Sequence, residues 1–246
     1  MALIIIDLDN TLAPSKEAIA PSMGEALTTL LRHADVGVIT GGKWEQCKKQ
    51  VIDRLPEEAS SYLHKLHIMP TCGTRLHSYS DNEWKETYAE YLDEEEKVLI
   101  RQALVESMHG MYDTSVLYGE IIEDRGSQIT FSALGQSAPT HAKEPFDPDQ
   151  KIRHAIVEKL ITKLPNHEMR IGGATSIDIT KKGMDKGYGI KRLAGHLSLS
   201  LDEIGFVGDA IFEGGNDYPA HQLGLQYVKV ANPEETEKHI RSWILV

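Results

Sequence analysis

The chain has 246 residues, of which 41% are hydrophobic and 26% charged, an ordinary composition for a globular protein with one large domain or two small ones. The formal net charge of −11 argues against nucleic-acid and anionic-membrane partners, because both favour basic surfaces. Cys47 and Cys72 have the spacing of neither a metal site nor a disulfide framework. No apolar run approaches the ~20 residues of a membrane span, so we expect a cytoplasmic protein.

The first part of the chain alternates short apolar segments with amphipathic ones. We predict strands at residues 3–6, 36–39 and 66–69, separated by helical segments at 21–32 and 45–55. The run at 3–6 is apolar without interruption, which is typical of a strand buried on both faces of a parallel sheet. Alternating strands and helices predict a doubly wound parallel sheet.

The pattern changes after about residue 84. A helix is predicted over 94–108, but residues 128–133 and 169–180 alternate polar and apolar side chains, as in antiparallel strands with one wet face. A second helix is predicted to begin with Asp147 as N-cap and Pro148 at its first position. This middle section is therefore expected to form an α+β module.

The α/β pattern returns with a predicted helix at 188–197, strands at 204–207 and 227–230, and a final helix. We thus predict an α/β fold, in which a doubly wound, Rossmann-like core formed by residues 1–83 and 186–246 carries an inserted α+β cap at 84–185.

Polar residues follow these predicted strands at the edge where open α/β sheets bind their ligands. Singly, each is more often a turn, a cap or a solvated side chain. Two carboxylates that lie close together repel each other unless a cation or phosphate chemistry requires them. Taken together, the residues indicate phosphoryl transfer: Asp7 and Asp9 after the first strand, Thr40-Gly41-Gly42 after the second, Lys186 before a helix, and Asp209, Asn216 and Asp217 after the strand at 204–207.

In this interpretation Asp7 attacks a phosphate and forms an aspartyl-phosphate, and Asp9 acts as general acid and base. A Mg²⁺ ion would neutralise the repulsion between the phosphate and Asp7. Its predicted surroundings are Asp7, Asp209 and a backbone carbonyl at Asp9, with Asn216 and Asp217 around them. The groups expected to hold the phosphate oxygens are Thr40, the amides of Gly41 and Gly42, and Lys186.

The four motifs resemble those of the haloacid-dehalogenase superfamily of phosphotransferases, and the cap position resembles its type IIB members. The likeness is greatest to the eukaryotic-type phosphomannomutase family, above all at residues 7–16, 125–136 and 172–217. The resemblance implies that Arg125 grips the distal phosphate of a hexose bisphosphate and that Ser176 and Asp178 touch the sugar. It also implies a homodimer formed through the cap.

The chain departs from this family at three cations. Gln136 stands where the family has a second cap arginine, Lys143 is the counterpart of a third, and Lys16 replaces an arginine near the first motif. Glutamine has no charge and lysine lacks the two-pronged guanidinium that matches a phosphate. The loss of one charged contact costs on the order of 1.5–3 kcal/mol, so the distal phosphate site is expected to be weakened.

The expected function is Mg²⁺-dependent phosphoryl transfer on a hexose phosphate, as in the interconversion of mannose 1-phosphate and mannose 6-phosphate. A sugar-phosphate phosphatase is the first alternative, because the thinned cation cluster favours hydrolysis. A non-catalytic sugar-phosphate-binding protein is the second, since a fold does not fix a function. The pair Asp7 and Asp9 argues against it, because binding alone gains nothing from an acid/base group.

Overall fold

The computed structural model describes residues 1–244 and divides the chain into two compact units. The first unit combines Met1–Ala89 with the chain from Asp185 onward, and the second is Glu90–Met184. Among residues 1–244, none of the helices combines the length and the apolar content needed to cross a membrane.

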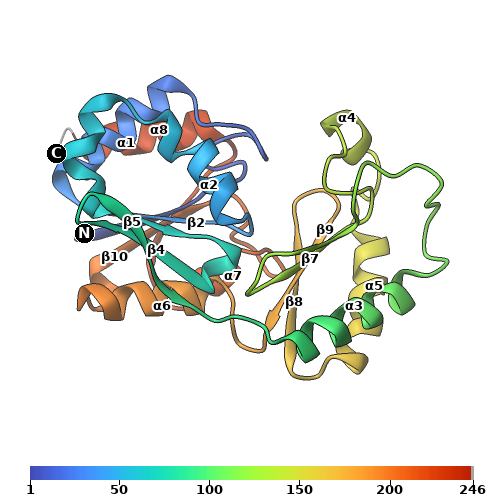
Figure 1. The fold of residues 1–246 in the computed structure, drawn as a ribbon. Coiled ribbons are helices and arrows are strands. Elements are labelled where there is room, and N and C mark those ends of the chain that lie inside the picture. The colour runs from blue at the N-terminus through green and yellow to red at the C-terminus, as the bar shows by residue number, and fades with distance from the viewer. Residues whose placement is uncertain (245–246) are drawn as a thin grey trace. The chain divides into compact units, whose positions relative to one another are not determined.

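A seven-stranded sheet in the order β11-β10-β1-β2-β3-β4-β5 forms the centre of the first unit (Figure 1). Neighbouring strands pair in parallel from β11 to β3, and β4 and β5 are antiparallel. The predicted α/β fold class is confirmed. The strands are β1 (Leu3–Asp7), β2 (Asp35–Ile39), β3 (Leu66–Met69), β4 (Arg75–Ser80), β5 (Glu83–Ala89), β10 (Ile204–Gly208) and β11 (Gln226–Lys229).

Helices cover both faces of this sheet because its central strands are apolar on both sides. Ile4 and Ile6 of β1 pack in the cluster that contains the buried side chains of α1, α2 and α8, whereas Leu3 and Ile5 pack with those of α6 and α7. Successive residues of a strand point to opposite faces, so one strand serves two cores. The helices are α1 (Pro21–His33), α2 (Trp44–Gln50), α6 (Lys186–Leu197), α7 (Tyr218–His221) and α8 (Pro233–Ile244).

The predicted boundaries between the domains need correction. Residues 84–89 were assigned to the cap, but they belong to β5, which pairs with β4 in the sheet of the first unit. Asp81 and Asn82 join the two strands with φ of 52° and 64°, as in the two-residue turns that suit hairpins. Asp185, also assigned to the cap, lies in the first unit and caps α6 by accepting a hydrogen bond from the Tyr188 N–H.

The second unit contains a four-stranded antiparallel sheet in the order β6-β7-β9-β8. Its apolar face packs on α3 and α5 through a cluster that includes Ile100, Phe131, Ile156 and Ile177. The elements are α3 (Glu94–Met108), β6 (Ile122–Asp124), β7 (Ile129–Ser132), α4 (Thr140–Lys143), α5 (Lys151–Lys163), β8 (His167–Gly172) and β9 (Ser176–Lys181).

Two expectations for the second unit were wrong in detail. The helix α5 begins at Lys151 rather than directly after Asp147, although Asp147 still accepts hydrogen bonds from the N–H groups of Ile152 and Arg153. The polar sheet face is not wet, because Thr130 and Asp178 are buried and hydrogen-bonded to each other.

Candidate active site

The three central strands of the first unit bring the predicted catalytic residues together. Asp7 ends β1, which pairs with β2 on one side and β10 on the other. Thr40 directly follows β2 and Asp209 directly follows β10. Because parallel strands end at the same edge, these side chains meet at the carboxyl end of the sheet.

Lys186 links two buried carboxylates across this edge. Its Nζ donates to Asp7 Oδ1 and, at 2.6 Å, to Asp217 Oδ1. The side chains of Lys186, Asp7 and Asp217 are only 1%, 3% and 0% exposed. Burial alone would lower the pKa of Lys186, but Asp217 and Asp7 outweigh it and raise the pKa above its usual value. Lys186 is therefore a buried cation held between two acids.

Acidic side chains crowd around Asp7. Burial raises the pKa of Asp7 well above its usual value, Lys186 opposes this, and the charges of Asp217, Asp9 and Asp209 raise it further. Burial, followed by the charge of Asp217, also raises the pKa of Asp209. The site thus concentrates negative charge that a bound cation would stabilise.

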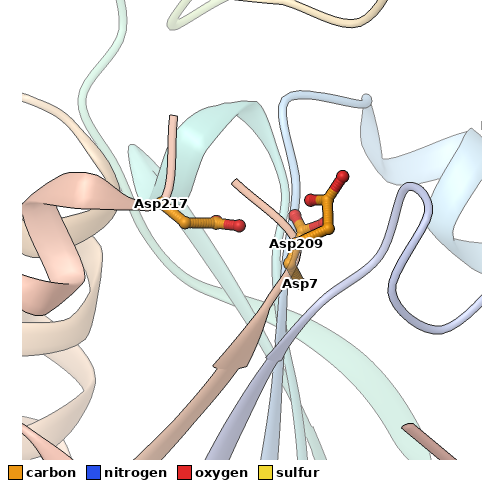
Figure 2. Close-up of side chains that lie close together, drawn as sticks. All are labelled: Asp7, Asp209 and Asp217. Atoms are coloured by element: carbon orange, nitrogen blue, oxygen red, sulfur yellow. The ribbon is translucent and has the colours of Figure 1, made fainter. Parts of the chain in front are cut away.

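Asp7, Asp209 and Asp217 each offer an oxygen, and these oxygens lie within 4.8 Å of one another (Figure 2). Asp217, predicted to lie around the ion, is thus close to both of the other carboxylates. Both oxygens of Asp217 are nevertheless engaged, one by Lys186 and the other by the Ala210 N–H at 3.1 Å. Asp217 comes this close because residue 208 is glycine: a Cβ there would lie 2.4 Å from Asp217 Oδ2.

This donor set fits Mg²⁺, which prefers hard oxygen ligands. Asp7 and Asp209 are the carboxylates best placed to hold it, since Asp217 already serves Lys186. Asn216 Oδ1 is buried without a hydrogen-bond partner in the described part of the chain, so it can accept from a water on the ion. The two carboxylates predicted as ligands, Asp7 and Asp209, thus both belong to this cluster.

Asp9 faces a different part of the edge. Its Oδ1 accepts from the Lys16 N–H at 2.9 Å and its Oδ2 accepts from Thr40 Oγ1 at 3.0 Å. Thr40 Oγ1 in turn accepts from the Gly42 N–H at 3.0 Å. The Gly42 amide, expected to bind a phosphate, therefore orients the hydroxyl of Thr40, and Thr40 orients Asp9. Lys16 enters through its backbone, while its side chain is exposed.

Sequence reasoning missed a turn that borders this site. Thr71, Cys72 and Gly73 follow β3 with φ of 51°, 58° and 80°. The N–H groups of Thr71 and Cys72 donate to the carbonyls of Gly42 and Thr40, both at 2.8 Å. Threonine and cysteine are uncommon at such angles, and only Gly73 offered a signal in the sequence.

The predicted cap residues all lie in the second unit, three of them on or beside its sheet and two outside its strands. On β9, Asp178 Oδ1 accepts from Gln128 Nε2 and Thr130 Oγ1, both at 2.8 Å, and Ser176 lies two residues before it, opposite Ser132 and Gly172. Arg125 pairs with Glu123: its Nε and Nη2 both contact Glu123 Oε2, at 2.8 Å and 2.7 Å.

Gln136 and Lys143 lie outside the four strands. Gln136 is in the loop after β7, where its backbone N–H donates to the Glu120 carbonyl, and Lys143 ends the short helix α4.

A buried arginine that the sequence pattern did not indicate, Arg153, holds the turn between β8 and β9. Arg153 pairs with Asp147 at 2.9 Å and donates to the Gly173 carbonyl at 2.8 Å. Nothing in an amphipathic helix pattern distinguishes it from a solvated arginine.

The chain is similar to known proteins over most of its length. Residues 23–245 match the family model of eukaryotic phosphomannomutases. The phosphomannomutase of Schizosaccharomyces pombe is 27% identical over 243 residues, which cover 95% of this chain and 91% of that protein. Mouse phosphomannomutase 1 is 27% identical over 225 residues, which cover 88% and 81% of the two chains.

Solved structures share the fold. The IMP-nucleotidase of Plasmodium falciparum superposes with a TM-score of 0.79 over 100% of this chain and 68% of its own, at 14% identity. A protein from Streptococcus mutans gives a TM-score of 0.67 over 100% and 99% of the two chains, at 15% identity. With the match over residues 23–245, the chain belongs to the eukaryotic phosphomannomutase family of the haloacid-dehalogenase superfamily.

Proposed function

We propose that this protein is a Mg²⁺-dependent phosphoryl-transfer enzyme that interconverts mannose 1-phosphate and mannose 6-phosphate. The observation that carries the proposal is Lys186, held between Asp7 and Asp217 beside Asp209. Family membership supports the same activity. Buried, strongly perturbed ionisable groups cluster at catalytic sites, and this cluster lies at the sheet edge where such folds bind their ligands.

Asp7 is the nucleophile in this proposal. Lys186 engages Asp7 Oδ1, so we assign Oδ2 as the oxygen that attacks phosphorus. A bond forms between Oδ2 and phosphorus as the bond from phosphorus to the sugar oxygen breaks. A bound Mg²⁺ ion would supply positive charge that lets a phosphate approach Asp7 and that stabilises charge in the transition state.

Asp9 moves the proton. It protonates the departing sugar oxygen, and it removes the proton from the hydroxyl that later takes the phosphate from Asp7. The hydrogen bonds from Thr40 and the Lys16 backbone hold the Asp9 carboxylate in place for both steps. The two transfers balance, because one phosphate leaves one hydroxyl and is returned to another.

A sugar-phosphate phosphatase is the second candidate. The neutral Gln136 and the lysines Lys143 and Lys16, where the family has arginines, favour it because a weakly held distal phosphate allows water to reach the aspartyl-phosphate. As further parts of the proposal, the protein is cytoplasmic, takes a small phosphorylated sugar and forms a homodimer through its second unit. Size-exclusion chromatography with light scattering tests the last point.

The deciding experiment incubates the protein and Mg²⁺ with mannose 1-phosphate, with and without a hexose 1,6-bisphosphate. Mannose 6-phosphate and free phosphate are quantified together. Mannose 6-phosphate that depends on the bisphosphate supports the mutase, and free phosphate alone supports the phosphatase. Asp7→Asn is expected to abolish either reaction, and Asp202→Asn, the same change at an exposed position of the first unit, is expected to be neutral. If neither product forms, phosphoryl transfer on mannose phosphates is refuted.

A further inference from the structure

The turn formed by Thr71, Cys72 and Gly73, called here the left-handed turn, is strained and buried. Thr71 has a φ of 51° and is completely buried, although branched side chains rarely adopt this conformation. Glycine or asparagine would form a simple turn with less strain. Strained conformations persist where the surrounding structure determines them, and they cluster at functional sites.

One side of the left-handed turn is bonded to the loop that orients Asp9. The Cys72 N–H donates to the Thr40 carbonyl and the Thr71 N–H donates to the Gly42 carbonyl, both at 2.8 Å. Thr40 and Gly42 are the two residues whose hydroxyl and amide form the chain that ends on Asp9 Oδ2. A shift of the turn therefore moves the hydroxyl that holds the acid/base group.

The other side of the turn touches α6, the helix that carries Lys186. A Cβ on Gly73 would lie 2.7 Å from the Gly189 Cα, so the two backbones are in direct contact one turn along the helix from Lys186. Tyr88 fixes the turn from β5, since its hydroxyl donates to the Gly73 carbonyl at 2.7 Å. The turn is itself tied together by Thr74, whose hydroxyl donates to the Thr71 carbonyl at 2.7 Å.

We infer that the left-handed turn is a positioning element of the phosphoryl-transfer site: it sets the Thr40–Gly42 loop, and with it Asp9, relative to the helix that carries Lys186. The residues of the turn touch no reacting atom in this scheme. They act through backbone hydrogen bonds on Thr40 and through backbone contact on Gly189. The inference rests on the proposed phosphoryl transfer but not on the identity of the sugar.

A misplaced Asp9 has a specific kinetic signature. Protonation of the leaving oxygen matters for a poor leaving group and little for a good one. Phenyl phosphate and 4-nitrophenyl phosphate differ in this respect and need no sugar-binding residues. The rate compared is kcat/KM, which reports only the steps up to departure of the leaving group and not the later transfer from Asp7, in which Asp9 also acts. A general loss of folding lowers kcat/KM for both esters together, whereas a shifted Asp9 lowers it for phenyl phosphate selectively.

The test substitutes Cys72. Cys72→Val disfavours positive φ, and the rate for phenyl phosphate is expected to fall ~10- to 100-fold, the range that a misplacement of about 1 Å causes. The rate for 4-nitrophenyl phosphate should change less than about threefold, because its leaving group needs little protonation. Cys72→Gly and Cys72→Asn, which accept positive φ, should restore the ratio of the two rates. Cys47→Val, the same change at another buried cysteine, is the matched control and should leave the ratio unchanged.

Equal losses on both esters, no loss on either, or a Cys72→Gly variant as impaired as Cys72→Val would each overturn the inference. If Cys72→Val does not fold, Gly189→Ala pushes the turn from the opposite side and should give the same selective loss. A wild-type protein that turns over neither ester nor mannose 1-phosphate would overturn the proposed phosphoryl transfer and this inference with it. If it turns over mannose 1-phosphate alone, that substrate replaces the esters, and a Cys72→Gly variant as impaired as Cys72→Val would overturn the inference. A wild-type protein that turns over both esters but no mannose phosphate would refute the proposed substrate, and the Cys72 series would still decide the inference.

Discussion

Replacing Asp217 with asparagine perturbs the buried pair with Lys186 while conserving shape. The amide oxygen can still accept from the Ala210 N–H, as Asp217 Oδ2 does at 3.1 Å. The amide nitrogen then faces the Lys186 ammonium, and two donors replace the ion pair at 2.6 Å. Because Lys186 is only 1% exposed, water cannot restore the lost interaction.

The size of the destabilisation by Asp217→Asn follows from the burial of both Lys186 and Asp217. Removing one member of a buried ion pair costs ~3–5 kcal/mol, and the retained bond to Ala210 and the remaining partner Asp7 favour the lower end. A loss of about 3 kcal/mol lowers Tm by roughly 6–12 °C for a chain of this size. Turnover should fall about 100-fold, because Lys186 is no longer held in position over Asp7.

Thermal unfolding followed by circular dichroism, together with turnover of mannose 1-phosphate, measures both effects. Glu213→Gln removes a charge from the same loop at an exposed position and should change stability by less than about 0.5 kcal/mol. An Asp217→Asn variant as stable as the Glu213→Gln control would refute the view that Lys186 depends on two buried carboxylates.

Three further results are expected. Mg²⁺ should stabilise the protein by about 2.7 kcal/mol at a 100-fold excess over its Kd, and Asp209→Asn should remove most of the rise in Tm; an unchanged rise would exclude Asp209 as a ligand. Burial and the charge of Arg75 lower the pKa of His77 from 6.5 to about 4. Between pH 6.5 and 4 the His77 imidazole is protonated in the unfolded chain but stays neutral in the native protein. The free energy of unfolding therefore falls as the pH drops through this range. The Tm of His77→Gln should fall less steeply over this range, and parallel curves would contradict the reasoning. Arg153→Met should cost ~3–5 kcal/mol because it leaves Asp147 buried without its partner; unaltered thermal unfolding would count against that pair as a stabilising contact.

Much of the core site could be predicted because two local rules suffice for it. An apolar run followed at once by Asp7 identifies a buried strand that ends in a carboxylate. Parallel strands end at one edge, so Thr40 and Asp209 had to lie near Asp7 once their strands were recognised. The structure places all three residues there.

The hairpin of β4 and β5 escaped recognition because it lies at the edge of the sheet. The strand β5 carries mostly exposed or half-buried residues, so its sequence lacks the apolar run that marks the central strands. Edge strands commonly carry charges that discourage pairing with other chains. Asp81 and Asn82 were the available signal, since both residues tolerate the positive φ of a tight turn.

Other features depend on contacts between distant residues, which no local pattern encodes. Lys186 and Asp7 are 179 positions apart, and Arg153 holds a carbonyl 20 positions away. The positive φ at Thr71 contradicts local preference, so only the surrounding structure explains it. The role of Asp217 likewise follows from the path of its loop and not from its neighbours in sequence.

The division of the first unit into two segments has a consequence for the order in which the protein folds. The strand β1 is completely apolar up to Asp7 and pairs with β10, which begins only at Ile204. A ribosome adds ~5–20 residues per second, so roughly 10–40 s pass between the synthesis of β1 and that of β10. Throughout this time its edge can pair with other chains.

The second unit is continuous from Glu90 to Met184 and is synthesised entirely within this interval. It can collapse around its own cluster of apolar residues while the first unit is still incomplete. Residue 185 then begins the segment that supplies Lys186, Asp209 and Asp217, so the active site cannot be completed until this second segment of the first unit is synthesised. Chains released before β10 emerges would carry a folded second unit and an exposed β1, and they would be the aggregation-prone products of incomplete synthesis.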